Sequence, residues 1–265
     1  MSKSGQARVL TPDQFAHLLS TIQQHRHAEK NTALMQISFK LGLRVQEIAL
    51  LQLKEVCRLG PTIGTTRDFT LHEILALPAA YTKGADALKR SRSTYQRRTI
   101  SFSKHDFDQL VKHIEKLAKA GGEINPEDFY PEVKKHRGKS RDLPMEDPAL
   151  REALTAYLHV RLAADPKANK TDPLFLSQKG GPYSPNTLQE HMALMQRDWA
   201  GVERASSHSG RRTLLTDIIH GQKKSVKIAQ KVAGHVSPST TLIYDEPPEE
   251  SVRDALEKSG ERYTS

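Results

Sequence analysis

The sequence predicts a mostly α-helical domain with a small β-hairpin sheet. Apolar residues recur at helical spacing along most of the 265 residues. Serine, threonine or proline precedes several of these stretches and glycine follows them, as at helix ends. One segment, "EVKKHRGKSRDLPM", has short arms around a glycine-containing turn, which is typical of a β-hairpin. Together these features favour helices packed around one small sheet.

The first predicted elements are three helices. Thr11-Pro12-Asp13-Gln14 combines an N-cap threonine, a proline in the first turn and a capping-box glutamine. A second helix is expected from about Asn31 to Leu41, with Gly42 ending it. The third begins near Arg44.

The middle of the chain is less regular. "GPTIGTTRD" and "GGEINPED" are typical of loops. Between them an amphipathic helix is expected to begin at Ser103 and end at Gly121. The run "KGADALKRSRSTYQRR", which precedes this helix, is strongly basic.

The second half predicts further helices after the hairpin. "DPALREALTAYLHVRLA" reads as a helix and "PLFLSQKGGPY" as a short strand and turn. Ser184-Pro185 begins another helix that reaches about Ala200.

Three short helices are expected over residues 206–248. Ser206 or Ser207 begins the first and Gly221 ends it, and Gly234 ends the second. Ser237-Pro238 begins the third, which is expected to carry Tyr244.

The charge of the chain is uneven. Forty Lys and Arg residues oppose 31 Asp and Glu residues, a net charge of +9. The tail 245–265 carries −4, which leaves +13 on the first 244 residues. Such a body suits a polyanion such as nucleic acid, although a basic protein without such a partner is an open alternative.

Other totals exclude several classes of protein. No apolar run reaches the length of a membrane span, and the first residues do not read as a signal peptide. Cys57 is the single cysteine, so an intrachain disulfide and a cysteine-based zinc cluster are excluded. We therefore expect a protein of the reducing cytoplasm, with no membrane partner.

Several polar residues fall at helix ends, where free N–H groups favour an anion. Arg44 follows Gly42, His208 and Arg211 share one first turn, and His235 follows Gly234. Two guanidinium groups can clamp one phosphodiester, and histidines can hydrogen-bond it. A tyrosine becomes a nucleophile once its developing charge is stabilised. No carboxylate cluster accompanies these residues, so two-metal catalysis is set aside and no metal or other cofactor is expected.

Each of these residues also has an ordinary interpretation. Arg211 reads equally as a surface arginine, His208 as a capping residue, His235 as a turn residue and Tyr244 as packing. The stretch "VKIAQKVAGHVSPSTTLIY" also resembles a helix-turn-helix. Taken one at a time, the residues do not distinguish these possibilities.

Together the residues form three ordered boxes: "GLRVQE" (42–47), "HSGRR" (208–212) and "AGHVSPSTTLIY" (233–244). These boxes resemble the motifs of the tyrosine recombinases, the phage integrase family, whose catalytic domain has the expected fold class. The resemblance is good over the last boxes, fair over residues 12–56 and poor in the middle.

The resemblance implies a role for each residue. Arg44 and Arg211 would grip the scissile phosphate, and His208 and His235 would complete its hydrogen bonding. Tyr244 would form a 3′-phosphotyrosyl bond, which stores the energy for rejoining without ATP or metal.

The family also uses a lysine on a β-hairpin as a general acid. Counting back from Pro144 points to Lys135, with Lys134 and Lys139 as alternatives. A turn that only contacts phosphate remains an alternative to a catalytic lysine. Glu47 is expected to support the Arg44 helix.

Three departures from the family pattern bear on function. Gly210 replaces the usual leucine, which is expected to weaken local packing. The stretch of about 58–130 is unusually long, and the usual N-terminal DNA-clamping domain is not expected in this chain. The basic run or a partner protein is therefore expected to replace the clamp. Expected DNA contacts are Arg90, Arg92, Arg97, Arg98, Lys139 and Arg212.

The sequence thus predicts a catalytic domain over 1–248 and an acidic tail helix over 249–265. We expect a site-specific recombinase or integrase, plausibly of a mobile element, that acts on double-stranded DNA as a homo-tetramer. Two alternatives stay open: DNA relaxation like that of a type IB topoisomerase, and a non-catalytic DNA-binding regulator.

Overall fold

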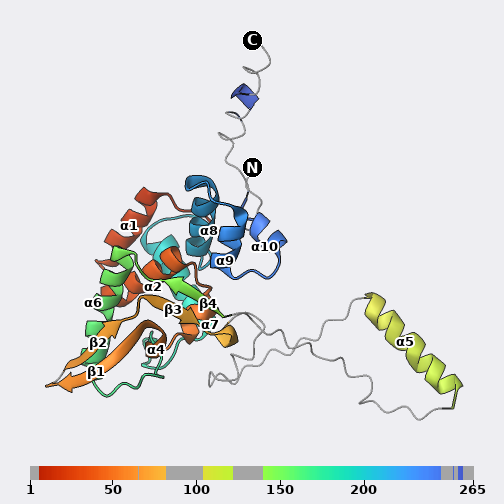
Figure 1. Ribbon diagram of the computed structural model, residues 1–265, viewed down its shortest axis with the longest axis horizontal. Helices are drawn as coiled ribbons and strands as arrows, with labels where there is room; N and C mark the ends of the chain where they lie inside the picture. The colour runs from red at the N-terminus through yellow and green to blue at the C-terminus, as the bar shows by residue number, and fades with distance from the viewer. Residues whose placement is uncertain are drawn as a thin grey trace.

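The computed structural model describes residues 6–64, 66–81, 104–121, 140–245, 253 and 256–258. The helices in these ranges are α1 (Pro12–Ile22), α2 (Ala28–Leu41), α3 (Val45–Leu50), α4 (Leu53–Val56), α5 (Lys104–Lys119), α6 (Pro148–Ala164), α7 (Pro185–Ala193), α8 (Ser209–Thr216), α9 (Val226–Ala233) and α10 (Pro238–Leu242). The strands are β1 (Cys57–Ile63), β2 (Thr66–Leu71), β3 (Ile74–Leu77) and β4 (Arg141–Pro144). The predicted fold class, mainly α with a small antiparallel sheet, is confirmed (Figure 1).

Helix ends follow the local sequence signals. Thr11 Oγ1 accepts a hydrogen bond from Gln14 N at 3.2 Å, and Gln14 Oε1 accepts one from Thr11 N at 3.1 Å. Ser184 Oγ likewise accepts a hydrogen bond from Thr187 N at 3.1 Å. These side chains satisfy backbone donors that have no partner within the helix. Beyond α7 and α8 the chain continues into the π-helical turns Leu194–Trp199 and Asp217–Gly221.

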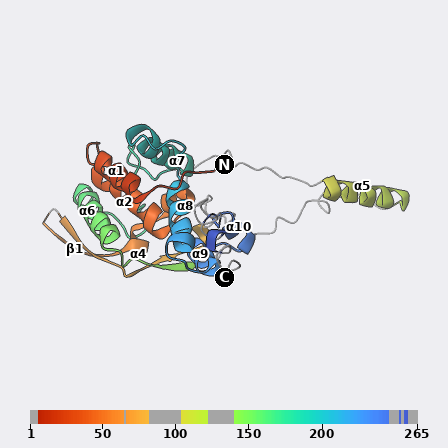
Figure 2. The ribbon, with the colours of Figure 1, turned by 90° about the horizontal axis from the view of Figure 1, so that it is seen from above.

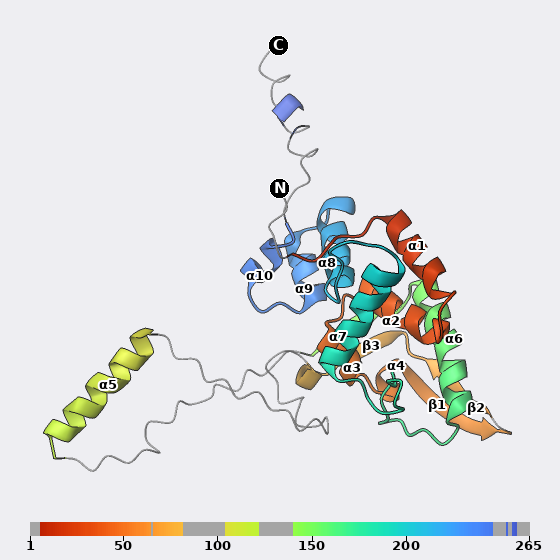
Figure 3. The same ribbon diagram turned by 180° about the vertical axis from the view of Figure 1, so that it is seen from behind.

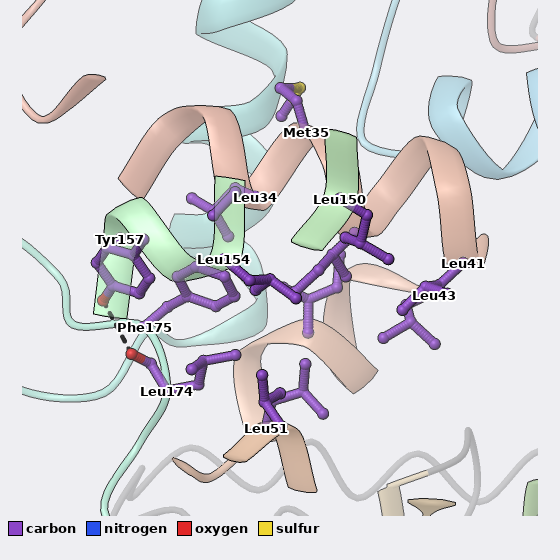
Figure 4. Close-up of a cluster of buried hydrophobic side chains, with 14 of the residues drawn as sticks. Leu34, Met35, Leu41, Leu43, Leu51, Leu150, Leu154, Tyr157, Leu174 and Phe175 are labelled. Atoms are coloured by element: carbon purple, nitrogen blue, oxygen red, sulfur yellow. Dashed lines mark hydrogen bonds between the residues drawn. The ribbon is translucent and has the colours of Figure 1, made fainter. Parts of the chain in front are cut away.

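A large core organises the body around α2, which packs against α1, α6 and α8. Figure 4 shows part of it, where leucines of α2 and α6 meet Phe175. The Tyr157 hydroxyl donates to the Leu174 carbonyl at 2.8 Å, so this buried polar group is satisfied. No helix among the described residues is both long and apolar enough to cross a membrane.

A second, smaller core lies under the C-terminal helices. Its buried members are Leu215, Ile218, Ile219, Ala229 and Ala233. It joins α8, the following π-helical turn and α9, which lie together at one end of the body (Figures 1 and 3).

The strands differ from the sequence prediction. Residues 60–64 and 66–68, expected as part of a loop, belong to the antiparallel β1–β2 hairpin, and its register shifts between Leu59 and Thr62. β4 pairs with β3, from Ile74 opposite Pro144 to Leu77 opposite Arg141. The first arm of the predicted local hairpin lies outside the described residues. "PLFLSQKGGPY" forms a turn with isolated bridges, so its predicted strand is wrong.

Two predicted helix boundaries are also wrong. The N-cap of α8 is His208, one or two residues after the expected serines. Helix α10 ends at Leu242, so Tyr244 lies two residues beyond it. Of the predicted tail helix, residue 253 and residues 256–258 are helical, and the rest lies outside the described residues.

Candidate active site

Arg44 is placed by a tight turn between α2 and α3. Gly42 ends α2 with a φ of 60°, and a side chain there would also meet Leu214. Arg44 then takes the N-cap position of α3 and remains partly exposed. Glu47, in the first turn of α3, accepts hydrogen bonds from Arg44 N at 2.7 Å and from Arg44 Nη1 at 3.2 Å. The carboxylate therefore fixes both ends of Arg44, the supporting role that the sequence predicts.

Arg211 lies in α8 and is 2% exposed. Its Nη1 donates to the Gly42 carbonyl at 2.7 Å, and its Nη2 donates to the Ala233 carbonyl. Nη2 also lies 2.9 Å from His235 Nε2. Arg211 thus joins the turn beside Arg44 to the turn that follows α9. These contacts take three of the five donors of a guanidinium group, which leaves two for a ligand.

His235 follows the αL glycine that ends α9, and it is buried. Because a guanidinium group can only donate, His235 Nε2 accepts from Arg211. Nδ1 then carries the proton and donates to Thr241 Oγ1 at 2.8 Å. Burial, followed by the charges of Arg211 and Arg44, lowers the pKa of His235 from 6.5 to about 3. The ring is therefore neutral at pH 7.

Arg141, at the start of β4, is a member of the cluster that the sequence reasoning missed. Its Nη2 donates to Glu47 Oε2 at 2.7 Å, and its Nη1 donates to the Ala233 carbonyl that Arg211 also holds. A side chain at position 234 would collide with Arg141, so Gly234 is required for this approach. Arg141 lies two residues before the buried Leu143 and so shares the inward face of β4. The spacing of Arg141 and Leu143 in the sequence is the one signal of this inward position, and the partner strand β3 was not predicted.

The cluster carries an excess of positive charge. Arg44, Arg141 and Arg211 surround the one carboxylate of Glu47, which is fully buried. Burial, followed by the charge of Arg44, lowers the pKa of Arg211 to about 10. Buried charges without a counter-ion are costly. The site is therefore suited to an anion that supplies the missing negative charge.

Tyr244 lies beside His235. The two rings are stacked, with centroids 5.8 Å apart and planes 17° from parallel. The tyrosine is partly buried against the small core, and its backbone N donates to the Thr241 carbonyl at 2.9 Å. Thr241, which holds His235, is fully buried and was also missed as a member of the site.

The two remaining predicted residues of α8 differ in exposure. His208 is exposed at the N-cap position, one turn before Arg211. Arg212 is partly buried. The cluster therefore brings together Arg44, Arg211, His235 and Tyr244. His208 lies three residues before Arg211 in the sequence, at the exposed N-terminus of α8. Residues Lys134, Lys135, Lys139, Arg90, Arg92, Arg97 and Arg98 lie outside the described residues.

Gly210 packs more tightly than the sequence suggested. A Cβ at this position would lie 2.3 Å from Ser38 Oγ and 2.9 Å from Phe39 Cδ2. Glycine therefore allows α8 to approach α2 closely, and the expected weakening of packing is wrong.

The site offers no metal-binding set of side chains among the described residues. Within them, no three His, Cys, Asp or Glu side chains gather as a metal site would require. The charged groups of the site are guanidinium groups and one carboxylate already engaged with two of them.

The sequence matches a protein-family model and several known proteins. The family model described as the phage integrase family matches residues 100–250. Tyrosine recombinase XerC of Methylobacterium sp. (strain 4-46) is 35% identical over 107 residues, which cover 40% of this chain and 32% of the relative. Tyrosine recombinase XerD of Corynebacterium glutamicum is 32% identical over 130 residues, 47% of this chain and 41% of the relative. The matched stretch thus spans less than half of each relative.

Solved structures share the fold. The XerA recombinase aligns with a TM-score of 0.58 at 16% identity, over 98% of this chain and 66% of that one. The XerH site-specific recombinase, bound to its palindromic difH substrate, aligns with a TM-score of 0.55 at 15% identity, over 94% of this chain and 52% of that one. These likenesses agree with the family match, which covers more than half of the sequence. The chain belongs to the phage integrase family.

Proposed function

We propose that the chain is a site-specific DNA recombinase or integrase of a mobile element that cuts and rejoins DNA through Tyr244. The observation that carries the proposal is the buried excess of guanidinium charge next to a tyrosine that stacks on His235. A phosphodiester supplies the missing negative charge, and the tyrosine supplies a nucleophile. A protein that only bound DNA would need the charge but not the tyrosine.

The proposed reaction is a transesterification. Tyr244 Oη attacks the phosphorus, the bond to the 5′ oxygen breaks, and a 3′-phosphotyrosyl bond forms. The tyrosine proton is lost to a base or to solvent, and the departing 5′ oxygen takes a proton from a general acid. We assign that acid to Lys135, with Lys134 or Lys139 as alternatives. A 5′ hydroxyl of another strand reverses the step, so no ATP is consumed.

The arginines and histidines would stabilise the pentavalent transition state. Arg44 and the two unused donors of Arg211 are assigned to the non-bridging oxygens. His208 and His235 are assigned to the remaining hydrogen bonds. Without DNA, both ring nitrogens of the neutral His235 are engaged, Nε2 with Arg211 and Nδ1 with Thr241, so its bond to the phosphate requires Nε2 to exchange Arg211 for a phosphate oxygen and to carry the proton. Charge stabilisation by guanidinium groups makes a divalent metal unnecessary in this scheme.

The assembly is also a proposal. The structure of the Tn1549 transposon integrase holds transposon right end DNA. For this chain we propose a tetramer on double-stranded DNA, with phosphate contacts from Arg90, Arg92, Arg97, Arg98, Lys139 and Arg212. The basic run 83–98 or a partner protein would hold the side of the duplex that faces away from the catalytic cluster.

A nicked suicide substrate tests the nucleophile. The 5′ fragment diffuses away after cleavage, so the covalent protein–DNA adduct accumulates and survives denaturant. Tyr244→Phe removes only the hydroxyl, so it should abolish the adduct while DNA binding persists. Tyr183→Phe is the matched control, because it removes a hydroxyl that bonds His191 elsewhere in the fold. An adduct with Tyr244→Phe would refute the assignment. Relaxation of plasmids without a specific site would favour the topoisomerase alternative.

A further inference from the structure

A second basic pocket lies at the base of the β1–β2 hairpin. Its volume is about 440 Å³. The lining residues come from α4, β1, β2, the link between β2 and β3, and the loop before Leu174. They are Lys54, Cys57, Arg58, Leu59, Arg67, His72, Asn169 and Lys170. Four of them carry a positive charge at pH 7 and none of them is acidic.

The pocket is partly preorganised by backbone contacts. Arg67 Nε donates to the Gly60 carbonyl at 3.2 Å, and its Nη1 donates to the Ala168 carbonyl. His72 Nε2 lies 3.1 Å from the Lys54 carbonyl oxygen. These contacts fix the side chains without neutralising Arg67.

Two further cations have no carboxylate partner within the part of the chain that the structure describes. Among the described residues, neither Arg58 nor Lys170 makes an ion pair with a carboxylate, and both are exposed. Lys54 lies 3.7 Å from Glu55, so its charge is partly balanced. The lining of the pocket therefore presents a net positive charge to solvent, as an anion site does, with the carboxylates of Glu55 and Asp172 beside it but outside the lining.

The pocket is separate from the catalytic cluster. None of its lining residues belongs to that cluster. The β1–β2 hairpin and helices α9 and α10 lie at opposite ends of the body, as Figures 1 and 2 show. An anion in the pocket is therefore not the scissile phosphate.

We propose that this pocket binds a backbone phosphate of the DNA duplex outside the cleavage site, an inference that rests on the proposed function. No Phe, Tyr or Trp lines it, so a base would find no large aromatic face to stack on. Lysine and arginine side chains around a small cavity suit contact with the phosphates of the DNA backbone, which does not depend on the base sequence. The pocket would give the catalytic body a hold on the duplex that does not depend on residues 83–98.

The test uses the full chain carrying Tyr244→Phe, so that binding is measured without cleavage. Its affinity for a long duplex of arbitrary sequence is measured as a function of NaCl concentration. Arg58→Ala with Lys170→Ala should flatten the log–log slope by about 0.9, since one phosphate contact contributes about 0.9. Each single substitution should flatten it by no more than about 0.9. The exchange Arg58→Lys with Lys170→Arg keeps both charges and should keep the slope.

The outcomes are separable. An unchanged slope in the double Ala variant overturns the pocket, as does equal flattening in the charge-keeping exchange. Weaker binding of inorganic phosphate, measured by calorimetry, with an unchanged DNA slope also overturns it. The melting temperature of the double Ala variant shows whether it is folded. If it is not, the salt slopes of the two single Ala variants test the proposal. Adduct formation by the wild type reports on the proposed function independently, because it does not involve the salt slope.

Discussion

Two parts of the site differ in how firmly the fold holds them. The first is the arginine cluster, which consists of Arg44, Arg141, Arg211 and Glu47, and the second is the tyrosine segment, residues 236–244. Glu47 and Arg211 are fixed by several side-chain hydrogen bonds and lie on α3 and α8, which pack against α2 and α7. Tyr244 follows the five-residue helix α10 and packs on a small cluster. Its neighbours Val236, Leu242 and Ile243 are at least half exposed. The arginine cluster is therefore part of the packed body, whereas the segment that carries Tyr244 makes few buried apolar contacts.

This difference has a mechanistic meaning under the proposed function. A phosphate-binding cluster that is preorganised needs no rearrangement when charge develops in the transition state. A nucleophile on a lightly packed segment can be moved at low cost, because local opening is easiest where few apolar contacts must break. The tyrosine is thus the part of the site that assembly can regulate.

The largest effect is expected at Glu47. Glu47→Gln leaves Arg141 buried without a carboxylate, and breaking a buried pair in this way costs about 3–5 kcal/mol of unfolding free energy. Urea unfolding measures the loss. The exposed Glu152→Gln on α6 is the control and should change stability by less than about 0.5 kcal/mol. A loss below about 1 kcal/mol for Glu47→Gln would mean that the cluster is not a rigid unit.

Arg211→Ala should slow cleavage of the suicide substrate by about 100-fold or more. Removing one preorganised donor from such a site typically raises the barrier by about 3–4 kcal/mol. Single-turnover adduct formation at saturating DNA measures the rate, so weaker binding does not enter. Excess EDTA should leave the wild-type rate unchanged. Loss of activity in EDTA that magnesium restores would contradict the metal-free scheme.

The sequence predicted those parts that depend on neighbouring residues. Gly42, Gly234 and Ser237-Pro238 mark helix ends through local backbone chemistry, so Arg44 and His235 could be placed from spacing. Arg211 links the turn beside Arg44 to His235 through tertiary contacts, and the order of the motifs along the sequence predicted that these residues come together.

The features that the sequence did not predict depend on contacts between residues far apart in the chain. β4 pairs with β3 across a long separation in the chain, which periodicity does not reveal. Arg141 became part of the site only through that pairing. The β1–β2 hairpin was missed because Gly60 and Pro61 read as loop residues, although the strand accommodates them at a register shift. The need for glycine at position 210 comes from Ser38, a distant residue that leaves no room for a side chain there.

His235 should make stability depend on pH. In the unfolded chain it takes a proton near pH 6.5, whereas in the fold it stays neutral down to about pH 3. The unfolded state therefore binds more protons between these values, and stability falls as pH drops below 6.5. The contribution should reach about 2 kcal/mol by pH 5. His235→Gln should lose this dependence, so the stabilities of wild type and variant are compared at pH 7 and pH 5. An equal loss of stability between pH 7 and pH 5 in wild type and variant would contradict the lowered pKa of His235.

The smallest effect on stability is expected on the tyrosine segment. Val236 is 75% exposed, so Val236→Ser should change the unfolding free energy by less than about 0.5 kcal/mol. Val160→Ser is the matched control, because Val160 is also exposed but lies on α6 in the main body. If the tyrosine segment is regulated by contact with a neighbouring protomer, Val236→Ser should reduce assembly on DNA in sedimentation experiments and Val160→Ser should not. Equal assembly of the two variants would place the protomer contact elsewhere, and the light packing of Tyr244 would then serve the reaction within one protomer.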